Sequence, residues 1–543
     1  MPLYLGLDSS TQSISAVVIE ASDSRREVIF ESSINFDEAF PRYQTRHGVL
    51  PRADPSVAVS SPVMWAEALE TMLVRVMQSV PGMRRLAAIA GSAQQHGSVY
   101  LNRDAGARLE TLNPAKTLAS QIPAMLARPV SPIWMDSSTT VECREIAQAV
   151  GGDEVLAAHT GSRAFERFTG PQIRKLLKQE RQGYLSTGRI HLVSSYMASL
   201  LAGRHAPLDP GDASGMNLMD LRSSSWWAPA LDATAPDLAS RLPLIAPAST
   251  VIGPLAPFWQ TRCGLRDARV VAWSGDNPCS LIGTGLVREG RVAISLGTSD
   301  TIFGLMREPR VDSTGTGHVF GAPTGDFMSL TVFKNGSLAR ERIRDAHAMS
   351  WAAFSAALEQ TPAGNRGRIL LPWFEPEITP AVLTAGERRY GLDPSDGPAN
   401  VRAVIEAEMM SMALHSRWMQ VNVDTIYATG GAAANRAILQ VMADVFGADV
   451  FQLEVGNSAA LGAALRAFHA DQLADGRDMP WDDVISGFVE PLVDSRVTPD
   501  ASRHNLYTRL IDAYAACEAH ALGKGAGQNP EILLASFRRS ELL

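Results

Sequence analysis

The sequence predicts a two-lobed α/β protein. The chain has 543 residues, well above the usual size of a single domain, so two large domains are the default expectation. Short apolar runs typical of strands alternate with stretches of helical apolar spacing, which indicates an α/β architecture. Two units of strand, polar turn and strand occur, one at the N-terminus and one about halfway along the chain. They indicate two structurally related halves that face each other.

The first half of the chain begins with one of these units. Its predicted elements are, in order, strand 3–7, polar turn 8–12, strand 14–19, helix 65–77, and strand 86–90 leading into the polar segment 91–97. Because only the turn separates the first two strands, it is the tip of a β-hairpin. The Pro- and Gly-rich segment 246–267 is interpreted as the junction between the lobes.

The second half repeats this logic. Its predicted elements are strand 270–273 running into 274–278, strand 292–296, polar turn 297–301, strand 302–303, helix 403–418, strand 426–429, helix 435–446 and a late helix 506–522. We therefore place the first lobe at residues 1–265 and the second at 266–480. We expect residues 481–543 to form helices that pack on the lobes.

Composition and charge are those of an ordinary globular protein. Hydrophobic residues make up 45% and charged residues 20% of the chain, enough for a substantial core. The formal net charge of -8 leaves no basic excess to neutralise the phosphates of a nucleic acid. If the ligand is an anionic nucleotide, backbone N–H groups, a metal ion and a few local cations must hold it.

Cysteine usage and the N-terminus indicate the compartment. The cysteines, Cys143, Cys263, Cys279 and Cys517, are far apart and suggest neither a zinc site nor a disulfide framework. Residues 1–8 have no basic segment and meet an acid within the first apolar run, so they predict a strand and not a signal peptide. No apolar run approaches the roughly 20 residues of a membrane helix. We expect a soluble cytoplasmic protein that binds no membrane; a homodimer is compatible with the sequence.

The first polar turn has the groups that bind a polyphosphate. Ser10, Thr11 and Gln12 offer side-chain and backbone donors to phosphate oxygens, and Asp8 at the base of the turn can hold hydrated Mg²⁺. The same residue types are typical of an ordinary polar turn, so both interpretations stay open for this turn alone.

The second turn strengthens the phosphate interpretation. Gly297, Thr298 and Ser299 repeat the chemistry and add a glycine for close backbone approach. Two opposed hairpins can clamp a polyphosphate from both sides. Gly430 and Gly431 between a strand and a helix permit a ligand to lie against bare backbone at the helix N-terminus.

The order hairpin, hairpin, then strand, Gly-Gly and helix resembles a known superfamily. This superfamily contains actin, the heat-shock chaperone ATPases and the sugar kinases. The resemblance implies an actin-like (ribonuclease H-like) fold that binds ATP, with the active site in the cleft between the lobes.

Three further segments could bind a polyol, as a sugar kinase requires. Residues 94–97 include His96, residues 209–217 include Asp212, and residues 274–278 include Asp276 and Asn277. Carboxylates, amides and imidazole each bond one or two hydroxyl groups. Each also has a structural alternative: His96 as a satisfied core histidine, Asp212 as the cap of a turn, and the Asp-Asn-Pro segment as turn chemistry.

These and other segments resemble the xylulokinase branch of the FGGY carbohydrate kinase family, particularly the longer type found in animals. The segments that carry the resemblance are 94–98, 134–140, 161–170, 211–218, 296–301 and 333–338. The resemblance extends from about residue 3 to 470 and is weaker at 102–130 and after 471. Glycerol kinases place an arginine and a glutamate where this chain has Gln95-His96-Gly97, which argues against glycerol as the substrate.

The resemblance implies ATP-dependent phosphorylation of D-xylulose at its C5 hydroxyl, with Mg²⁺. It implies sugar contacts from His96, Arg167, Asp276 and Asn277. It implies nucleotide contacts from Ser10, Thr11, Gln12, Gly297, Thr298, Ser299, Trp351, Gly430, Gly431 and Asn435. Asp212 matches the catalytic base and Asp8 the magnesium-associated aspartate. Trp351 could instead be a core tryptophan. A kinase for another ketose and a non-kinase ATPase are the alternative functions.

Overall fold

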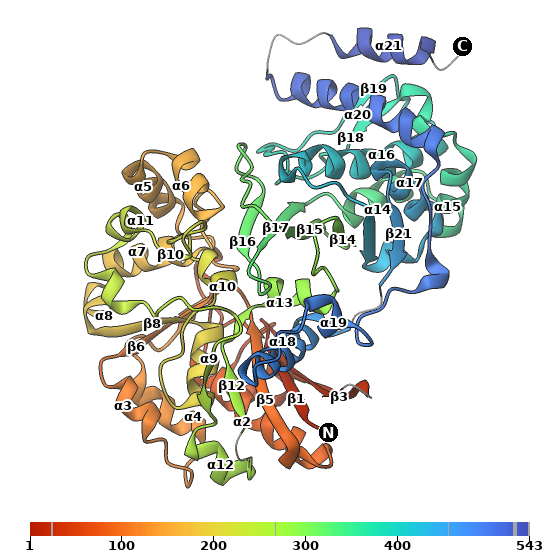
Figure 1. The fold of residues 1–543 in the computed structure, drawn as a ribbon. Coiled ribbons are helices and arrows are strands. Elements are labelled where there is room, and N and C mark those ends of the chain that lie inside the picture. Colours follow the sequence, from red (N-terminus) through yellow and green to blue (C-terminus); the bar gives the residue numbers. More distant parts are fainter. Residues whose placement is uncertain (23–24, 266–267, 454–455, 525–528, 541–543) are drawn as a thin grey trace.

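Two mixed β-sheets organise the chain, one in each lobe, and they share one plan (Figure 1). The computed structural model describes residues 1–22, 25–265, 268–453, 456–524 and 529–540. In each sheet a polar-tipped hairpin has a third antiparallel strand on one side and a parallel strand on the other. The predicted two-lobed α/β class is confirmed.

The first sheet has the strand order β11-β12-β5-β1-β2-β3, with β13 beside β5. Its strands are β1 (Leu3–Ser9), β2 (Ser13–Ala21), β3 (Arg26–Asn35), β5 (Leu86–Ala93), β11 (Val251–Pro254), β12 (Arg269–Val271) and β13 (Ser274–Gly275). The second sheet has the order β16-β17-β15-β14-β20-β21. Its strands are β14 (Arg291–Leu296), β15 (Asp300–Met306), β16 (His318–Gly321), β17 (Phe327–Phe333), β20 (Thr425–Thr429) and β21 (Asp449–Gln452).

Among the described residues, four short strand pairs lie outside these sheets. They are β4 (Val59–Ser60) with β7 (Ser131–Pro132), β6 (Ser98–Asn102) with β8 (Thr187–Leu192), β9 (Met219–Asp220) with β10 (Ser225–Trp226), and β18 (Ile369–Leu371) with β19 (Arg388–Tyr390).

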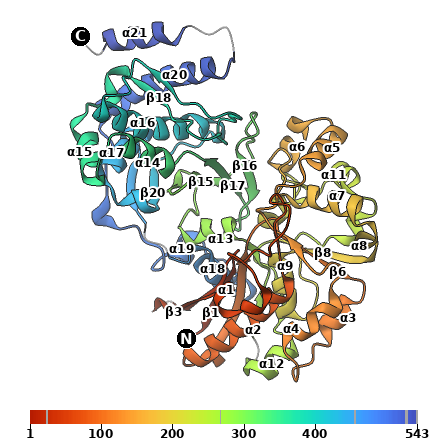
Figure 2. The same cartoon turned by 180° about the vertical axis from the view of Figure 1, so that it is seen from behind.

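Helices cover both sheets and extend each lobe (Figure 2). Those of the first lobe are α1 (Phe36–Ala39), α2 (Pro62–Ser79), α3 (Ala105–Glu110), α4 (Leu118–Gln121), α5 (Thr140–Val150), α6 (Asp153–Thr160), α7 (Thr169–Gln179), α8 (Arg181–Ser186), α9 (Val193–Ala202), α10 (Pro210–Ser214), α11 (Ala228–Thr234), α12 (Pro257–Cys263) and α13 (Asp276–Gly283). Later helices are α14 (Ser337–Ala346), α15 (Trp351–Gln360), α16 (Gly397–His415), α17 (Arg436–Phe446), α18 (Ser458–Ala474), α19 (Trp481–Ile485), α20 (Ala501–Ala521) and α21 (Pro530–Ser540). In the described part of the chain, none combines the length and apolar character needed to cross a bilayer.

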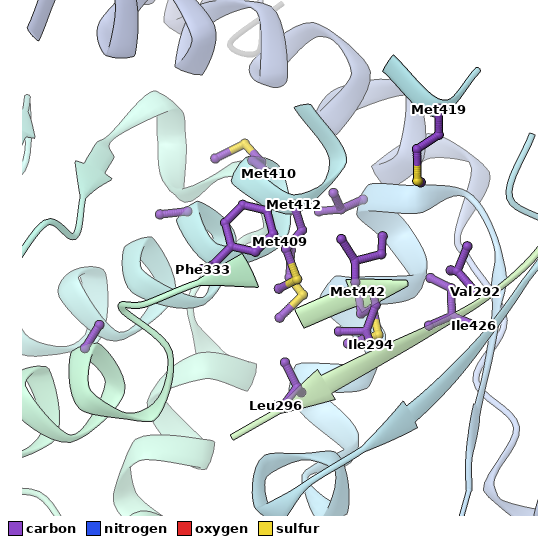
Figure 3. Packing of buried hydrophobic residues seen from close by; sticks show 14 of the residues in the cluster. Val292, Ile294, Leu296, Phe333, Met409, Met410, Met412, Met419, Ile426 and Met442 are labelled. Carbon is purple, nitrogen blue, oxygen red and sulfur yellow. The ribbon is translucent and has the colours of Figure 1, made fainter. Parts of the chain in front are cut away.

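A methionine-rich core joins α16 to the second sheet (Figure 3). Met409, Met410 and Met412 of α16 are buried in the same cluster as Ile294 and Leu296 of β14. Methionine is unbranched and flexible, so it fills the irregular space between a helix and a twisted sheet. This packing holds β14, and with it the second polar turn, against the body of the lobe.

The first lobe extends past residue 265. The interpretation of residues 246–267 as a lobe junction is wrong where the structure describes them, because β11 and α12 lie there. Pro254 ends a strand at the edge of the first sheet and Pro257 lies in the first turn of α12, two places where a missing N–H costs little. The strands that follow, β12 and β13, pair with β5. The first sheet therefore ends at Gly275.

The chain also returns to the first lobe after the second sheet. In Figure 1, α18 lies beside β1 and β5 although more than 150 residues of the second lobe precede it. Glycines permit the contact: a Cβ on Gly6 would lie 2.0 Å from the carbonyl oxygen of Ala460. A Cβ on Gly462 of α18 would lie 1.9 Å from that of Cys279 in α13. The C-terminal helices α20 and α21 pack instead on the second lobe.

We predict that Gly462→Ala destabilises the protein. The added methyl group would collide with the backbone of α13, and overpacking of this kind costs about 1–3 kcal/mol. The readout is the urea midpoint of the first unfolding transition. Gly183→Ala in α8 is the matched control, because a Cβ there has its nearest neighbour at 3.6 Å and alanine favours a helix. Equal midpoints for the two variants would contradict the role of this contact.

Candidate active site

The tip of the first hairpin is held from two sides. The Ser10 N–H donates to the carbonyl oxygen of Ser13 at 2.9 Å and closes the turn. The indole N–H of Trp134 donates to Thr11 Oγ1 at 2.8 Å. Gly48 lies so close that a Cβ there would be 1.8 Å from the carbonyl oxygen of Thr11. The conformation of the tip is therefore fixed by contacts within the protein before any ligand binds, as the binding of a phosphate by backbone donors requires.

A cavity of about 820 Å³ opens beside the tip of the second hairpin. Among the described residues that line it are Gly297, Thr298, Trp351, Ser355, Gly431 and Asn435. Trp351 has 46% of its surface exposed, so the interpretation as a core tryptophan is wrong. The cavity brings together residues of the second turn, α15 and the Gly-Gly segment, and within the described residues Ser299 and Gly430 do not line it.

Gly430 and Asn435 shape the wall of this cavity. Gly430 has a φ of 86°, and a Cβ there would lie 2.5 Å from the carbonyl oxygen of Leu296. Only glycine lets β20 end so close to β14. The Asn435 side chain caps α17 by accepting from the Ala437 N–H at 3.0 Å, and it donates to Ser355 Oγ at 2.7 Å. Its amide therefore ties α17 to α15 across the cavity.

A buried ion-pair network supports the second turn from below. Arg340 of α14 donates to Asp300 Oδ2 at 2.9 Å, to Glu408 Oε2 at 2.7 Å and to the carbonyl oxygen of Gly297 at 3.2 Å. Burial alone would lower the pKa of Arg340, but Glu408 and Asp300 outweigh it and raise that pKa. The guanidinium therefore stays charged and holds the turn in place.

Three polar segments interlock on the first-lobe side of the cleft. Asn277 Nδ2 donates to Gln95 Oε1 at 2.9 Å, and Gln95 Nε2 donates to the carbonyl oxygen of Gly211 at 3.3 Å. His96 Nδ1 lies 2.7 Å from the carbonyl oxygen of Gly215. The segments chosen from the sequence for their polyol chemistry thus come together.

His96 is neutral, and no hydrogen-bond partner of its second ring nitrogen is found among the described residues. A carbonyl oxygen only accepts, so Nδ1 carries the proton toward Gly215 and Nε2 is an acceptor. Burial, and then the charge of Arg167, lower the pKa of His96 to about 3. The His96 ring packs on the Phe168 ring, with centroids 4.7 Å apart. The guanidinium carbon of Arg167 lies 5.7 Å from the centroid of the Phe168 ring.

Asp212 is buried, and within the described part of the chain one of its carboxylate oxygens has no partner. Ser194 Oγ donates to Oδ2, whereas Oδ1 has no hydrogen-bond partner among the described residues. Burial, and then the nearby Asp209 and Asp276, raise the pKa of Asp212 well above its usual range. The alternative role as a cap of the following turn is wrong, because among the described residues the Asp212 side chain accepts only from Ser194. Asp209 is the residue that caps α10, by accepting from the Asp212 N–H at 2.9 Å.

The carboxyl groups of Asp8 and Asp276 interact, since Asp276 contributes to the pKa of Asp8. Burial, and then Asp276, raise the pKa of Asp8 to about 7, although Ser92 Oγ donates to it at 2.6 Å. Burial raises the pKa of Asp276 to about 6. Within the described residues no cluster of three or more metal-ligating side chains occurs. One or two carboxylates fit Mg²⁺, which keeps several waters and takes its other ligands from substrate phosphates.

Family models match most of both lobes. Residues 126–283 match the N-terminal domain of the FGGY family of carbohydrate kinases, and residues 292–470 match its C-terminal domain. The chain belongs to this family. It is a carbohydrate kinase, and the predicted resemblance is confirmed. The two matched segments meet between residues 283 and 292, beyond the boundary predicted at residue 265.

Individual relatives agree with this assignment. The chain is 39% identical over 535 residues to the xylulose kinase of Rattus norvegicus, covering 96% of this chain and 98% of the relative. It is 42% identical over 490 residues to xylulose kinase 2 of Arabidopsis thaliana, covering 86% and 87%. Among solved structures, the xylulose kinase of Rhodospirillum rubrum superposes with a TM-score of 0.78 at 21% identity, covering 96% and 99%. The glycerol kinase of Plasmodium falciparum superposes with a TM-score of 0.74 at 14% identity, covering 95% and 98%. These two likenesses concern the fold.

Several residues of the kinase site lay outside the sequence-based selection. Ser194, His318, Arg340 and Glu408 bond partners between 18 and 156 positions away, and no local pattern marks them. Trp134 was within a motif that carries the resemblance, but its bond to the first turn was not foreseen.

We predict that Asp8→Asn stabilises the protein progressively more as the pH rises from about 4 to 7. The pKa of Asp8 in the folded protein is raised to about 7. The contribution of Asp8 to stability is therefore fully present below its pKa in the unfolded chain, and it is lost as the pH rises through its pKa in the folded protein. The slope of the stability difference is at most about 1.4 kcal/mol per pH unit. It is measured by urea unfolding at several pH values.

The exposed Asp104 supplies a matched control for this prediction. Asp104→Asn changes a carboxylate that faces solvent in the folded and the unfolded chain, so no comparable slope is expected. A flat pH dependence for Asp8→Asn would contradict the burial of an ionisable Asp8.

Proposed function

We propose that this kinase phosphorylates D-xylulose at the C5 hydroxyl, with MgATP as the donor. The observation that carries the proposal is Oδ1 of the buried Asp212, which has no partner among the described residues and lies near polar groups that suit a polyol. The choice of sugar rests on relatives that are named xylulose kinases.

Asp212 is the proposed general base. As the C5 oxygen attacks the γ-phosphorus, the hydroxyl proton passes to Asp212 Oδ1, a new O–P bond forms, and the bond from the γ-phosphorus to the bridging oxygen breaks to release ADP. Burial raises the pKa of Asp212, so its ionised form is a stronger base than an exposed carboxylate. Base assistance of this kind typically contributes about 10²–10⁴-fold. Alignment and charge stabilisation would supply most of the remaining acceleration.

The nucleotide would occupy the cavity beside the second turn. Trp351 and Gly431 line the part suited to the adenosine, and the Asn435 amide holds the wall. The two hairpin tips would hold the phosphates through their N–H groups and hydroxyls. Bound Mg²⁺ would neutralise charge on the phosphates, and Asp8 is the side chain best placed to hold it.

The sugar would lie on the first-lobe side. His96 Nε2 and the Asn277 amide oxygen offer acceptors, Asp276 offers carboxylate oxygens, and Arg167 offers donors to hydroxyl groups. The amide nitrogen of Asn277 already donates to Gln95 and Asp276. Closure of the lobes would exclude water, which could otherwise receive the phosphoryl group in place of the sugar.

A panel of pentuloses and polyols tests the substrate. We expect D-xylulose to accelerate ADP release more than ribulose, other ketoses, polyols or glycerol. The preferred sugar is identified by comparing kcat/KM across the panel. A higher kcat/KM for another ketose would make that ketose the substrate and would not affect the proposed mechanism. ADP release that no sugar accelerates would refute the proposed function.

We predict that Asp212→Asn abolishes turnover while ATP still binds. The amide cannot take the proton, so kcat should fall by at least about 10²-fold. Kinetics give kcat, and calorimetry gives the Kd of ATP. Asp220→Asn is the control, and it should leave kcat unchanged. Asp220 lies outside the proposed site, where its Oδ2 is 2.6 Å from His159 Nδ1. A near-normal kcat for Asp212→Asn would remove Asp212 as the base.

A further inference from the structure

Strand β16 belongs to the second sheet but docks on the first lobe. Figure 1 shows it between the lobes, and it pairs with β17 at the edge of the second sheet. The Val319 N–H donates to the carbonyl oxygen of Gly161 at 3.0 Å, and the Gly321 N–H donates to Ser214 Oγ at 3.1 Å. A Cβ on Gly161 would lie 2.3 Å from the carbonyl oxygen of Val319. The docking therefore depends on close backbone contact.

His318, the first residue of β16, connects two residues of the first lobe. Its side chain is buried, with 2% exposed. Arg167 Nη2 lies 3.0 Å from His318 Nε2, and Ser162 Oγ lies 3.0 Å from His318 Nδ1. A guanidinium only donates, so Nε2 accepts, and the proton is on Nδ1, which donates to Ser162 Oγ. Burial, and then Arg167, lower the pKa of His318 well below its usual range, consistent with this neutral tautomer.

The position of the Arg167 guanidinium depends on this contact. Its guanidinium carbon lies 5.1 Å from the ring centroid of Phe165 and 5.7 Å from that of Phe168. These rings offer a face but no directional acceptor. In the part of the chain that the structure describes, no ion pair of Arg167 is found, and His318 is its one hydrogen-bond acceptor. One N–H is thus committed and the other donors stay available.

We propose that His318 is a positioning residue for sugar binding. By accepting from one N–H of Arg167, it aims the remaining N–H donors at the hydroxyl groups of the sugar. Because β16 comes from the second lobe, the sugar site is completed only when that lobe is docked on the first. This inference rests on the proposed role of Arg167 as a sugar contact.

A pair of isosteric substitutions tests the proposal. In His318→Gln the amide reaches the place of Nε2 and can still accept from Arg167, whereas in His318→Asn it reaches only the place of Nδ1. Both remove the ring, so both lose the aromatic packing. We expect His318→Asn to raise the KM for the sugar about 10- to 100-fold, the value of a hydrogen bond to a charged group. His318→Gln should raise it much less, and neither should change the KM for ATP comparably.

A double-mutant cycle separates positioning from general loosening. In an Arg167→Ala background, His318→Asn should have little further effect on the KM for the sugar, because the residue through which it acts is gone. His415→Asn controls for the loss of a histidine ring. His415 lies outside the site, and its Nε2 is 3.0 Å from Glu518 Oε2. Equal effects of the Gln and Asn variants, or additive effects with Arg167→Ala, would overturn the proposal.

The assays use whichever sugar the panel shows to accelerate ADP release. The inference can therefore fail while the kinase activity stands, and a substrate other than xylulose would still test it. Should neither His318 variant fold, Ser162→Ala decides, because it leaves the ring in place and removes only the Nδ1 partner. An increased KM for the sugar with an unchanged KM for ATP would support the proposal, and an unchanged KM for the sugar would overturn it.

Discussion

Close backbone contact with α13 holds α18 against the first lobe, and a buried arginine on α18 fixes its position. Arg466 donates to the carbonyl oxygens of Gly91, Ala248 and Ala272 at 3.2, 2.9 and 2.7 Å, at the ends of first-sheet strands or just beside them. A buried guanidinium must find acceptors, so α18 is held in this one position. The positive charge of Arg466 acts to lower the pKa of Asp212, so it partly offsets the increase that burial causes. The arginine that holds α18 therefore also opposes, as a minor contribution, the increase in the pKa of Asp212.

Around this joint the cleft collects carboxyl groups whose burial is unfavourable. Asp8, Asp212 and Asp276 all have raised pKa values, with burial as the largest cause. An ordinary hydrophobic core would have apolar residues at these positions. Ionising a buried carboxyl group costs free energy, and its hydrogen bonds do not fully offset that cost. The proposed binding of a cation and a sugar hydroxyl at these carboxyl groups would account for their burial. The second turn follows the opposite strategy, since Arg340 there has its carboxylate partners within 3 Å.

The hairpins and the Gly-Gly segment could be predicted because their patterns are local. Strand, polar turn and strand follow within 20 residues, and the sequence register of β1 and β2 places Ser9 opposite Ile14. Gly430 was singled out for a ligand, yet its positive φ and its closeness to Leu296 give it a structural role first. The expected sugar contacts came from resemblance, and the interlocking of Gln95 with Asn277 and Gly211 is a tertiary fact.

The sequence alone determined the two-lobed class and both polar turns, because each is written in neighbouring residues or in a short motif. The candidate base was predicted from the family resemblance. Only the tertiary structure decided where the lobes end. Composition placed a junction at Pro- and Gly-rich residues, but those prolines occupy a strand edge and a first helical turn. It also decided that α18 returns to the first sheet and that His318 of the second lobe meets Arg167 of the first. Such contacts join residues far apart in the chain, and side-chain periodicity reports which face is buried without saying against what.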